Sequence, residues 1–223
     1  MQKQVCWKCG KIIPENDFVD QSRRFCENCY EVHSDEYRAV KTEYAILKNQ
    51  IMFERAMRFM EKACSDMTRL KPYALAVKKH SRDNPELYLS SHEMMSAVVL
   101  LAEGYNIQMN ASVGHFRVDI LIPELYVCFE IDGDRHKFTP SQDGKRDTEI
   151  RAKLGGLWEV VRIPTKYIEE QPEKIPEAIK EIYAGIKKIR SENNGLLPEK
   201  YSKRHKAYYE QNTLQAIRKT HVI

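Results

Sequence analysis

Three acidic residues in the middle of the chain are spaced so that they could hold a metal ion. Asp119 lies in one apolar stretch, Glu130 and Asp132 end the next, and Pro123-Glu124 forms a tight turn between them. Residues i and i+2 of a strand point to the same face, and a hairpin can bring Asp119 beside the other two. Neighbouring carboxylates repel one another unless a cation joins them, and hard oxygen ligands suit Mg²⁺ or Mn²⁺. Because such ions support phosphodiester hydrolysis, the sequence predicts a hydrolytic site at the end of a β-hairpin.

Four cysteines near the N-terminus predict a second metal site. Cys6 and Cys9 form one C-x-x-C pair, Cys26 and Cys29 form another, and sixteen residues separate the pairs. This spacing suits a tetrahedral zinc site, and four thiolates leave no open position for catalysis. The pairs resemble a zinc ribbon or a treble-clef finger. We therefore expect structural zinc in residues 1–33, where it supplies folding energy that so short a segment lacks.

The C-terminal tail is the most basic part of a chain whose formal net charge is only +4. Basic side chains neutralise phosphates and tyrosine rings stack on bases, so the tail predicts nucleic-acid binding. A solvated amphipathic helix explains the same residues. The basic residues from position 199 onward are Lys200, Lys203, Arg204, Lys206, Arg218 and Lys219.

The composition favours a globular protein of the cell interior. The chain has 223 residues, of which 42% are hydrophobic, and it contains no apolar run long enough to span a membrane. Its N-terminus has no apolar signal segment. We expect a soluble, cytoplasmic protein that binds DNA and not membranes and that a phage or a mobile element could encode.

A long helix is predicted over residues 34–64, with Ser34 as its N-cap. Two apolar stripes follow each other along it, with the offset that a stutter produces. The helix could pair with a second copy of itself, giving a homodimer, or pack its stripe on the rest of the chain. The first stripe is Tyr37, Val40, Tyr44, Leu47 and Ile51, and the second is Phe53, Met57, Met60 and Cys64.

The remaining pattern predicts an α/β fold with a small mixed sheet flanked by helices. A helix starts at Ser90 and ends before Gly104, with Glu93 at the capping-box position. The two hairpin strands follow. A helix over residues 142–155, a strand over 158–163 and a helix over 172–190 complete the predicted domain.

This order of elements and residues resembles the PD-(D/E)XK nuclease superfamily, whose core is that of the restriction endonucleases. It is most similar to the branch around the very-short-patch-repair endonuclease and its uncharacterised relatives. That branch carries a helix glutamate, a strand aspartate, E-x-D-G-x-x-H, D-x-x-R-x-x-x-L, a glycine and an aromatic strand ending in arginine. The matching residues are Glu93, Asp119, Glu130, Asp132, Gly133, His136, Asp147, Arg151, Leu154, Gly156, Trp158 and Arg162.

The resemblance implies roles for these residues. Asp119 and Glu130 would bind Mg²⁺ or Mn²⁺, with Asp132 completing or orienting the site. Glu93 would have a catalytic role, either holding a second ion or orienting the water. Asp132 stands where the namesake motif has lysine, as is usual in this branch, so water activation must come from elsewhere. His136 suits general acid–base work, and Lys145 or Arg151 could offset charge on the reacting phosphate.

Structural explanations stand beside these catalytic ones. Glu93 could act as a helix cap, Asp132 could belong to a turn, and His136 could orient its neighbours. Asp147 and Arg151 fit bracing of the helix against the site better than chemistry. Cys64 and Cys128 fit core thiols.

The resulting prediction is a metal-dependent DNA endonuclease in four segments. These are a zinc module over residues 1–33, the long helix and a linker over 34–88, the nuclease-like domain over 89–190, and the basic tail over 191–223. One alternative is a structure-selective enzyme such as a junction resolvase. Another is a nucleic-acid-binding protein that keeps the nuclease fold without turnover.

Overall fold

The computed structural model describes residues 5–6, 8–13, 26–133 and 140–197. The chain forms two compact units, Met1–Lys48 and Asn49–Ile223. Helix α1 (Glu27–Ala63) begins in the first unit and continues into the second. The predicted start of this helix at Ser34 is wrong. Cys26 lies immediately before the first turn, so the second cysteine pair and the helix form one local structure.

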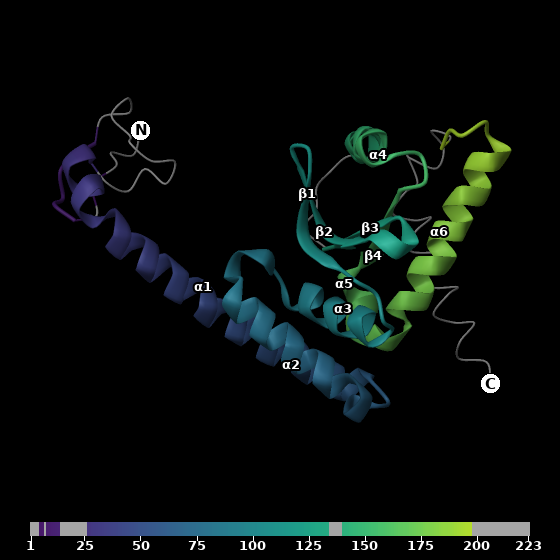
Figure 1. The fold of residues 1–223 in the computed structure, drawn as a ribbon, viewed down its shortest axis with the longest axis horizontal. Coiled ribbons are helices and arrows are strands. Elements are labelled where there is room, and N and C mark those ends of the chain that lie inside the picture. Colours follow the sequence, from purple (N-terminus) through teal and green to yellow (C-terminus); the bar gives the residue numbers. More distant parts are fainter. Residues whose placement is uncertain (1–4, 7, 14–25, 134–139, 198–223) are drawn as a thin grey trace. The chain divides into compact units, whose positions relative to one another are not determined.

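A four-stranded mixed sheet forms the centre of the second unit (Figure 1). Its strands are β1 (Gln108–Val113), β2 (Phe116–Ile122), β3 (Val127–Asp132) and β4 (Glu159–Pro164), in that spatial order. β1, β2 and β3 are antiparallel neighbours, and β4 runs parallel to β3. The predicted hairpin is confirmed, with the short 3-10 turn Pro123–Leu125 between its strands. β1 was not predicted, because its residues lack the alternation of β-branched side chains that marks a strand.

Helices cover both faces of the sheet. α4 (Pro140–Leu154) lies on one face, and α3 (Ser91–Ala102) and α5 (Thr165–Glu170) lie on the other (Figure 1). The predicted helix before Gly104 is confirmed, and α4 starts two residues before the predicted helix. On the α4 side, Ile150 packs with Cys128 and Val160 in a small buried cluster.

The larger core lies on the opposite face. It joins the sheet to α2 (Met67–Asp83), α3, α5 and α6 (Ile175–Glu192) and to the last turns of α1. Its largest side chains include Phe129 from β3, Met94 and Met95 from α3, and Met60 from α1, all without exposed surface. The second apolar stripe of the long helix is therefore a core stripe.

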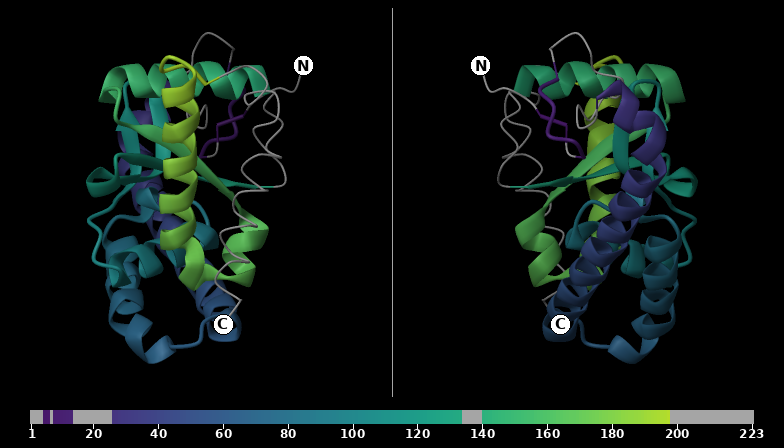
Figure 2. Two further views of the ribbon diagram at one scale, coloured as in Figure 1. Left: turned by 90° about the vertical axis from the view of Figure 1, so that its right-hand side faces the viewer. Right: turned by 90° about the vertical axis from the view of Figure 1, so that its left-hand side faces the viewer.

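The part of α1 from Asn49 onward lies beside α2 (Figures 1 and 2). The Asn49 amide donates hydrogen bonds to the carbonyl oxygens of Ser81 at 2.9 Å and Pro85 at 3.0 Å. Pro72 lies inside α2 near its start, and the helix continues to Asp83. The 3-10 turns Pro85–Leu87 and Pro172–Lys174 precede α3 and α6.

Candidate functional site

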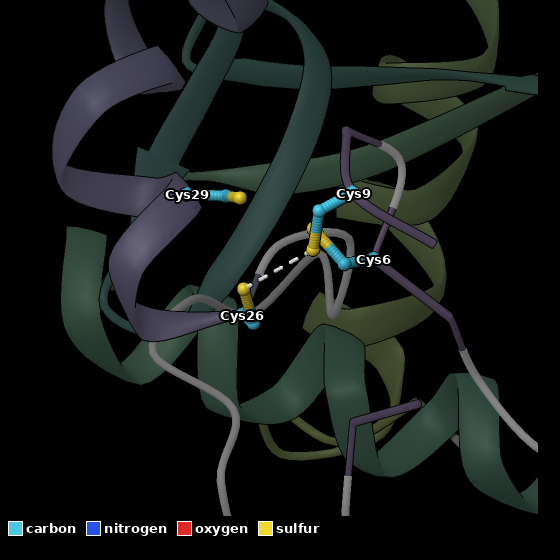
Figure 3. Close-up of side chains that lie close together, drawn as sticks. All are labelled: Cys6, Cys9, Cys26 and Cys29. Carbon is cyan, nitrogen blue, oxygen red and sulfur yellow. Dashed lines mark hydrogen bonds between the residues drawn. The ribbon is translucent and has the colours of Figure 1, made fainter. Parts of the chain in front are cut away.

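The four predicted zinc ligands lie together in the first unit. The sulfur atoms of Cys6, Cys9, Cys26 and Cys29 are all within 4.8 Å of one another, and Figure 3 shows their side chains converging. The Cys9 and Cys26 sulfurs are 3.8 Å apart. A tetrahedral site with Zn–S bonds of about 2.3 Å has sulfur–sulfur distances of about 3.8 Å. The cluster therefore fits a metal ion such as zinc.

Two different local structures supply these ligands. In the first, the Cys6 N–H donates to the Lys11 carbonyl, the Gly10 N–H donates to the Cys6 carbonyl, and Gly10 adopts a positive φ of 71°. This tight turn points Cys6 and Cys9 to one side. In the second, Cys26 precedes α1 and Cys29 lies in its first turn, with the Cys29 N–H donating to the Cys26 carbonyl.

Hydrogen bonds and burial shift the pKa values of two thiols of the cluster in opposite directions. Burial raises the pKa of Cys6, but backbone hydrogen bonds from Cys9, Cys26 and Lys8 outweigh it and bring that pKa down to about 6. A side-chain hydrogen bond with Cys26, together with burial, raises the pKa of Cys29 to about 12. Metal binding requires thiolates, so an ion must displace protons here, most of all from Cys29.

The acidic residues of the hairpin lie where the pairing of its two strands ends. The last pair of the ladder is Ile120 with Phe129, and Asp119 and Glu130 follow it, one on each strand. Among the described residues, Asp119, Glu130 and Asp132 do not gather closely enough to form a metal-binding set. The Ile131 N–H donates to Asp119 Oδ2 at 2.8 Å, which fixes the position of that carboxylate. Asp132 ends β3, is half-buried, and lies beside Pro164 of β4.

Arginine side chains surround Glu130. Arg146 of α4 donates to Glu130 Oε2 at 2.7 Å and to Oε1 at 2.5 Å, in a bidentate pair, and also to the Arg117 carbonyl at 2.8 Å. The Arg146 guanidinium lies 5.7 Å from the centre of the Phe116 ring. Arg162, which is adjacent to Glu130 on β4, has a nitrogen 3.8 Å from Oε2. The negative charge of the Glu130 carboxylate is thus balanced by the guanidinium groups of Arg146 and Arg162.

Asp147 completes this charged network. Arg162 donates to its two carboxylate oxygens at 2.7 Å and 2.5 Å, and both side chains are about nine-tenths buried. Two acids, Glu130 and Asp147, therefore balance two arginines, Arg146 and Arg162. The interpretation of Asp147 as a brace agrees with this geometry. The two carboxylates of the network also act on the thiol of Cys128. Burial raises the pKa of this thiol to about 12, and the negative charges of Glu130 and Asp147 contribute to the rise.

Glu93 is buried, with 5% of its surface exposed, and caps α3. The Ser90 side chain accepts a hydrogen bond from the Glu93 N–H at 3.2 Å, as the capping box requires. The Glu93 carboxylate accepts hydrogen bonds from the Leu89 N–H and the Ser90 hydroxyl, both at 2.9 Å. The expected cap is present, and the catalytic role of Glu93 stays a prediction.

The other predicted site residues are dispersed or lie beyond the described residues. Lys145 is exposed on α4. His136 and the basic residues Lys200, Lys203, Arg204 and Lys206 lie outside the described residues. Within the described part of the chain, the four cysteines are the one set of three or more metal-binding side chains that gathers closely enough to hold an ion.

Arg146 is a member of this charged network that the sequence did not predict. A signal was available, because Arg146 precedes the inward-facing Ile150 by four residues and so shares its helix face. A charged residue on the buried face of a helix requires a partner of opposite charge.

A second buried acid, Glu159, was also missed. It is 2% exposed and lies 2.8 Å from Arg190 of α6 and 3.4 Å from Arg151 of α4. Burial raises the pKa of Glu159, and the two arginines oppose that rise. Arg151 also donates to the Gly156 carbonyl at 2.7 Å, so it links α4 to the segment that enters β4, and its predicted bracing against the site stays a prediction.

Comparisons of the chain with models of protein families, with curated proteins and with solved structures found no match. Across the described residues, none of the helices combines the length and the apolar character needed to cross a bilayer.

Proposed function

We propose that the chain is a metal-dependent endonuclease that hydrolyses phosphodiester bonds of DNA. The observation that carries this proposal is the placement of Asp119 and Glu130 just beyond the last β2–β3 pair, with the half-buried Asp132 at the end of β3. Mg²⁺ is usually held by one or two carboxylates, with water and substrate phosphate completing its shell. Two carboxylates on neighbouring strands therefore fit this ion in donor type and number.

The arginines around Glu130 suit a site that receives a phosphodiester. Arginine binds phosphate and carboxylate with the same bidentate geometry. A cation that binds Glu130 would release the Arg146 guanidinium from it. A substrate phosphate could then replace the Glu130 carboxylate as the partner of Arg146. Arg162 would stay beside Asp147, which holds it at both oxygens.

Each residue then has a defined task. Asp119, oriented by the Ile131 N–H, and Glu130 hold the cation, which supplies Lewis acidity and offsets phosphate charge. Arg146 changes partner from carboxylate to phosphate. The four-cysteine module and the basic tail contribute affinity for the DNA backbone.

Nicking of supercoiled plasmid by the full-length protein, with and without Mg²⁺, tests this assignment. Asp119→Asn and Glu130→Gln keep the size of each side chain and should each lower the Mg²⁺-dependent rate by about 100-fold or more. Glu61→Gln is the matched control, because Glu61 is an exposed glutamate on α1, and it should nick like wild type. Thermal unfolding of each variant separates loss of chemistry from loss of fold. Equal nicking by wild type and Glu130→Gln would overturn the proposal.

A DNA-binding protein without turnover is the second candidate, and the bidentate Arg146–Glu130 pair favours it. In that case the guanidinium keeps Glu130 from any ion. Wild type, Asp119→Asn and Glu130→Gln would then all fail to nick DNA while binding it in a gel-shift assay. A panel of flaps, junctions, mismatches and linear duplexes distinguishes a junction resolvase from a general endonuclease.

A further inference from the structure

We propose that the chain forms a parallel homodimer through the exposed apolar face of α1 between Tyr44 and Ile51. Tyr44, Leu47 and Ile51 are 69%, 55% and 57% exposed. Large apolar side chains that gather on one exposed helix face mark an interaction surface. This inference does not depend on the proposed nuclease activity.

The spacing of the three residues is that of a coiled coil. Steps of three and four place Tyr44 and Ile51 at heptad position a and Leu47 at position d. Among parallel coiled coils, Ile at a with Leu at d favours two strands over three or four. In the sequence, Tyr37 and Val40 extend the same spacing by one heptad; their side chains lie outside those that the structure describes.

The opposite face of α1 is already occupied by its own chain. Asn49, at heptad position f, is 2% exposed and donates to two carbonyl oxygens at the end of α2 and beyond it. Phe53 and Ala56 are buried in the main core. α1 continues as one helix through the stripe, so the a and d residues lie on a formed helix. A partner therefore avoids the cost of helix nucleation, which makes short isolated coiled coils weak.

The charges beside the stripe specify a second copy in parallel orientation. Glu43 occupies position g and Lys48 position e, five residues later, and both are exposed. In a parallel pair, g of one helix meets the following e of its partner, so Glu43 faces Lys48 of the other copy. An antiparallel pair would set g beside g and e beside e, bringing like charges together.

The same register defines where the contact ends. The next d and a positions are Glu54 and Arg58, both exposed and charged, and a parallel pair would bring each beside its own copy. The contact therefore stops after Ile51 and extends toward the N-terminus. Over the described side chains, from Tyr44 to Ile51, it covers one heptad, about 12 Å of helix.

The oligomeric state of the full-length, zinc-loaded protein tests the proposal by light scattering after size exclusion, and by sedimentation. Wild type should have twice the 26.2 kDa mass of one chain. Leu47→Glu should be monomeric, with at least about a 10-fold weaker dimer, because it puts two carboxylates at a d layer. The matched control is Leu75→Glu on α2, which is 57% exposed and lies off the stripe. It should remain dimeric.

Charge exchange tests the orientation. Glu43→Lys and Lys48→Glu should each weaken the dimer, because each sets like charges opposite one another in a parallel pair. The double variant E43K/K48E should restore the wild-type dimer. Strengthening by either single change would show an antiparallel contact and overturn the proposed orientation.

Two results would overturn the dimer itself. One is a wild type that stays monomeric up to about 100 µM, which leaves this face to a different partner. The other is a dimer that Leu47→Glu leaves intact, which places the contact elsewhere.

Discussion

At the scale of single residues, Glu93 shows how one side chain can satisfy two interpretations. Its position three residues after Ser90 predicts a cap, and its place on the first helix of the domain resembles a nuclease glutamate. The structure provides the cap, because both Glu93 oxygens accept hydrogen bonds at the start of α3. These bonds would also orient a carboxylate that acts in the site.

Glu93→Ala should destabilise the protein by about 1–3 kcal/mol, because a buried N–H loses its acceptor and the cap is lost. Glu93→Gln keeps an oxygen for the Leu89 N–H and should retain most of the stability. Urea unfolding followed by circular dichroism measures both. If Glu93 also acts in catalysis, the glutamine variant should lose nicking activity while it stays folded. An alanine variant as stable as wild type would contradict the capping role.

Arg146 and Glu130 show where residue types alone mislead. The sequence marks Glu130 as an acid in an apolar strand, which requires a partner, and a metal ion is one such partner. An arginine from α4 is another, and helix packing decides whether it can reach. The Glu130 carboxylate can therefore bind either a metal ion or Arg146. Binding of a metal ion supports the endonuclease, and the pair with Arg146 supports the DNA-binding protein without turnover.

At the scale of elements, buried ion pairs join α4 to the sheet in addition to the short apolar stripe of this helix. Arg162 of β4 holds Asp147, Arg146 of α4 holds Glu130 of β3, and all four side chains are mostly buried. Breaking one partner of a buried pair leaves an uncompensated charge, whereas removing both partners costs less.

A double-mutant cycle on Asp147 and Arg162 should reveal this coupling. Asp147→Asn and Arg162→Gln should each cost about 3–5 kcal/mol of unfolding free energy, and the double variant should cost less than their sum. The exposed pair Lys166–Glu170 on α5, 3.9 Å apart, is the control and should couple by no more than about 0.5 kcal/mol. Additive costs at Asp147 and Arg162 would show that the two side chains do not act as a pair.

Elements with strong local signals could be predicted, and those without could not. The hairpin strands, α3, α4 and β4 have apolar periodicity and clear ends such as Ser90 and Gly104. β1 has neither, and it becomes a strand because it pairs with β2 at the sheet edge. Ser34 looked like a cap because its side chain suits one, yet the helix starts at Glu27, where Cys26 ends the preceding segment.

At the scale of the whole molecule, the two compact units have different sources of stability. The second unit has a large apolar core, whereas the buried apolar cluster of the first consists of Cys6 and Ile13, with Cys26, Cys29 and Tyr30 packed against it among the described residues. So small a cluster needs a metal to hold its fold.

Cys6→Ser should therefore release zinc and unfold the first unit while the second unit keeps its thermal transition. Metal analysis of the purified protein measures zinc per chain, and calorimetry separates the transitions. Cys64→Ser is the control, because that half-buried thiol lies outside the cluster, and it should retain one zinc. An unchanged zinc content in Cys6→Ser would contradict the ligand assignment.

The sequence by itself determined the four cysteine ligands, the hairpin with its carboxylates and the cap of α3, because local spacing and residue type specify each of these. Only the tertiary structure decided which stripe of α1 enters the core and which stays exposed, and that Arg146 reaches Glu130. Both outcomes depend on contacts between segments far apart in the chain, and periodicity along one segment contains no information about its distant neighbours.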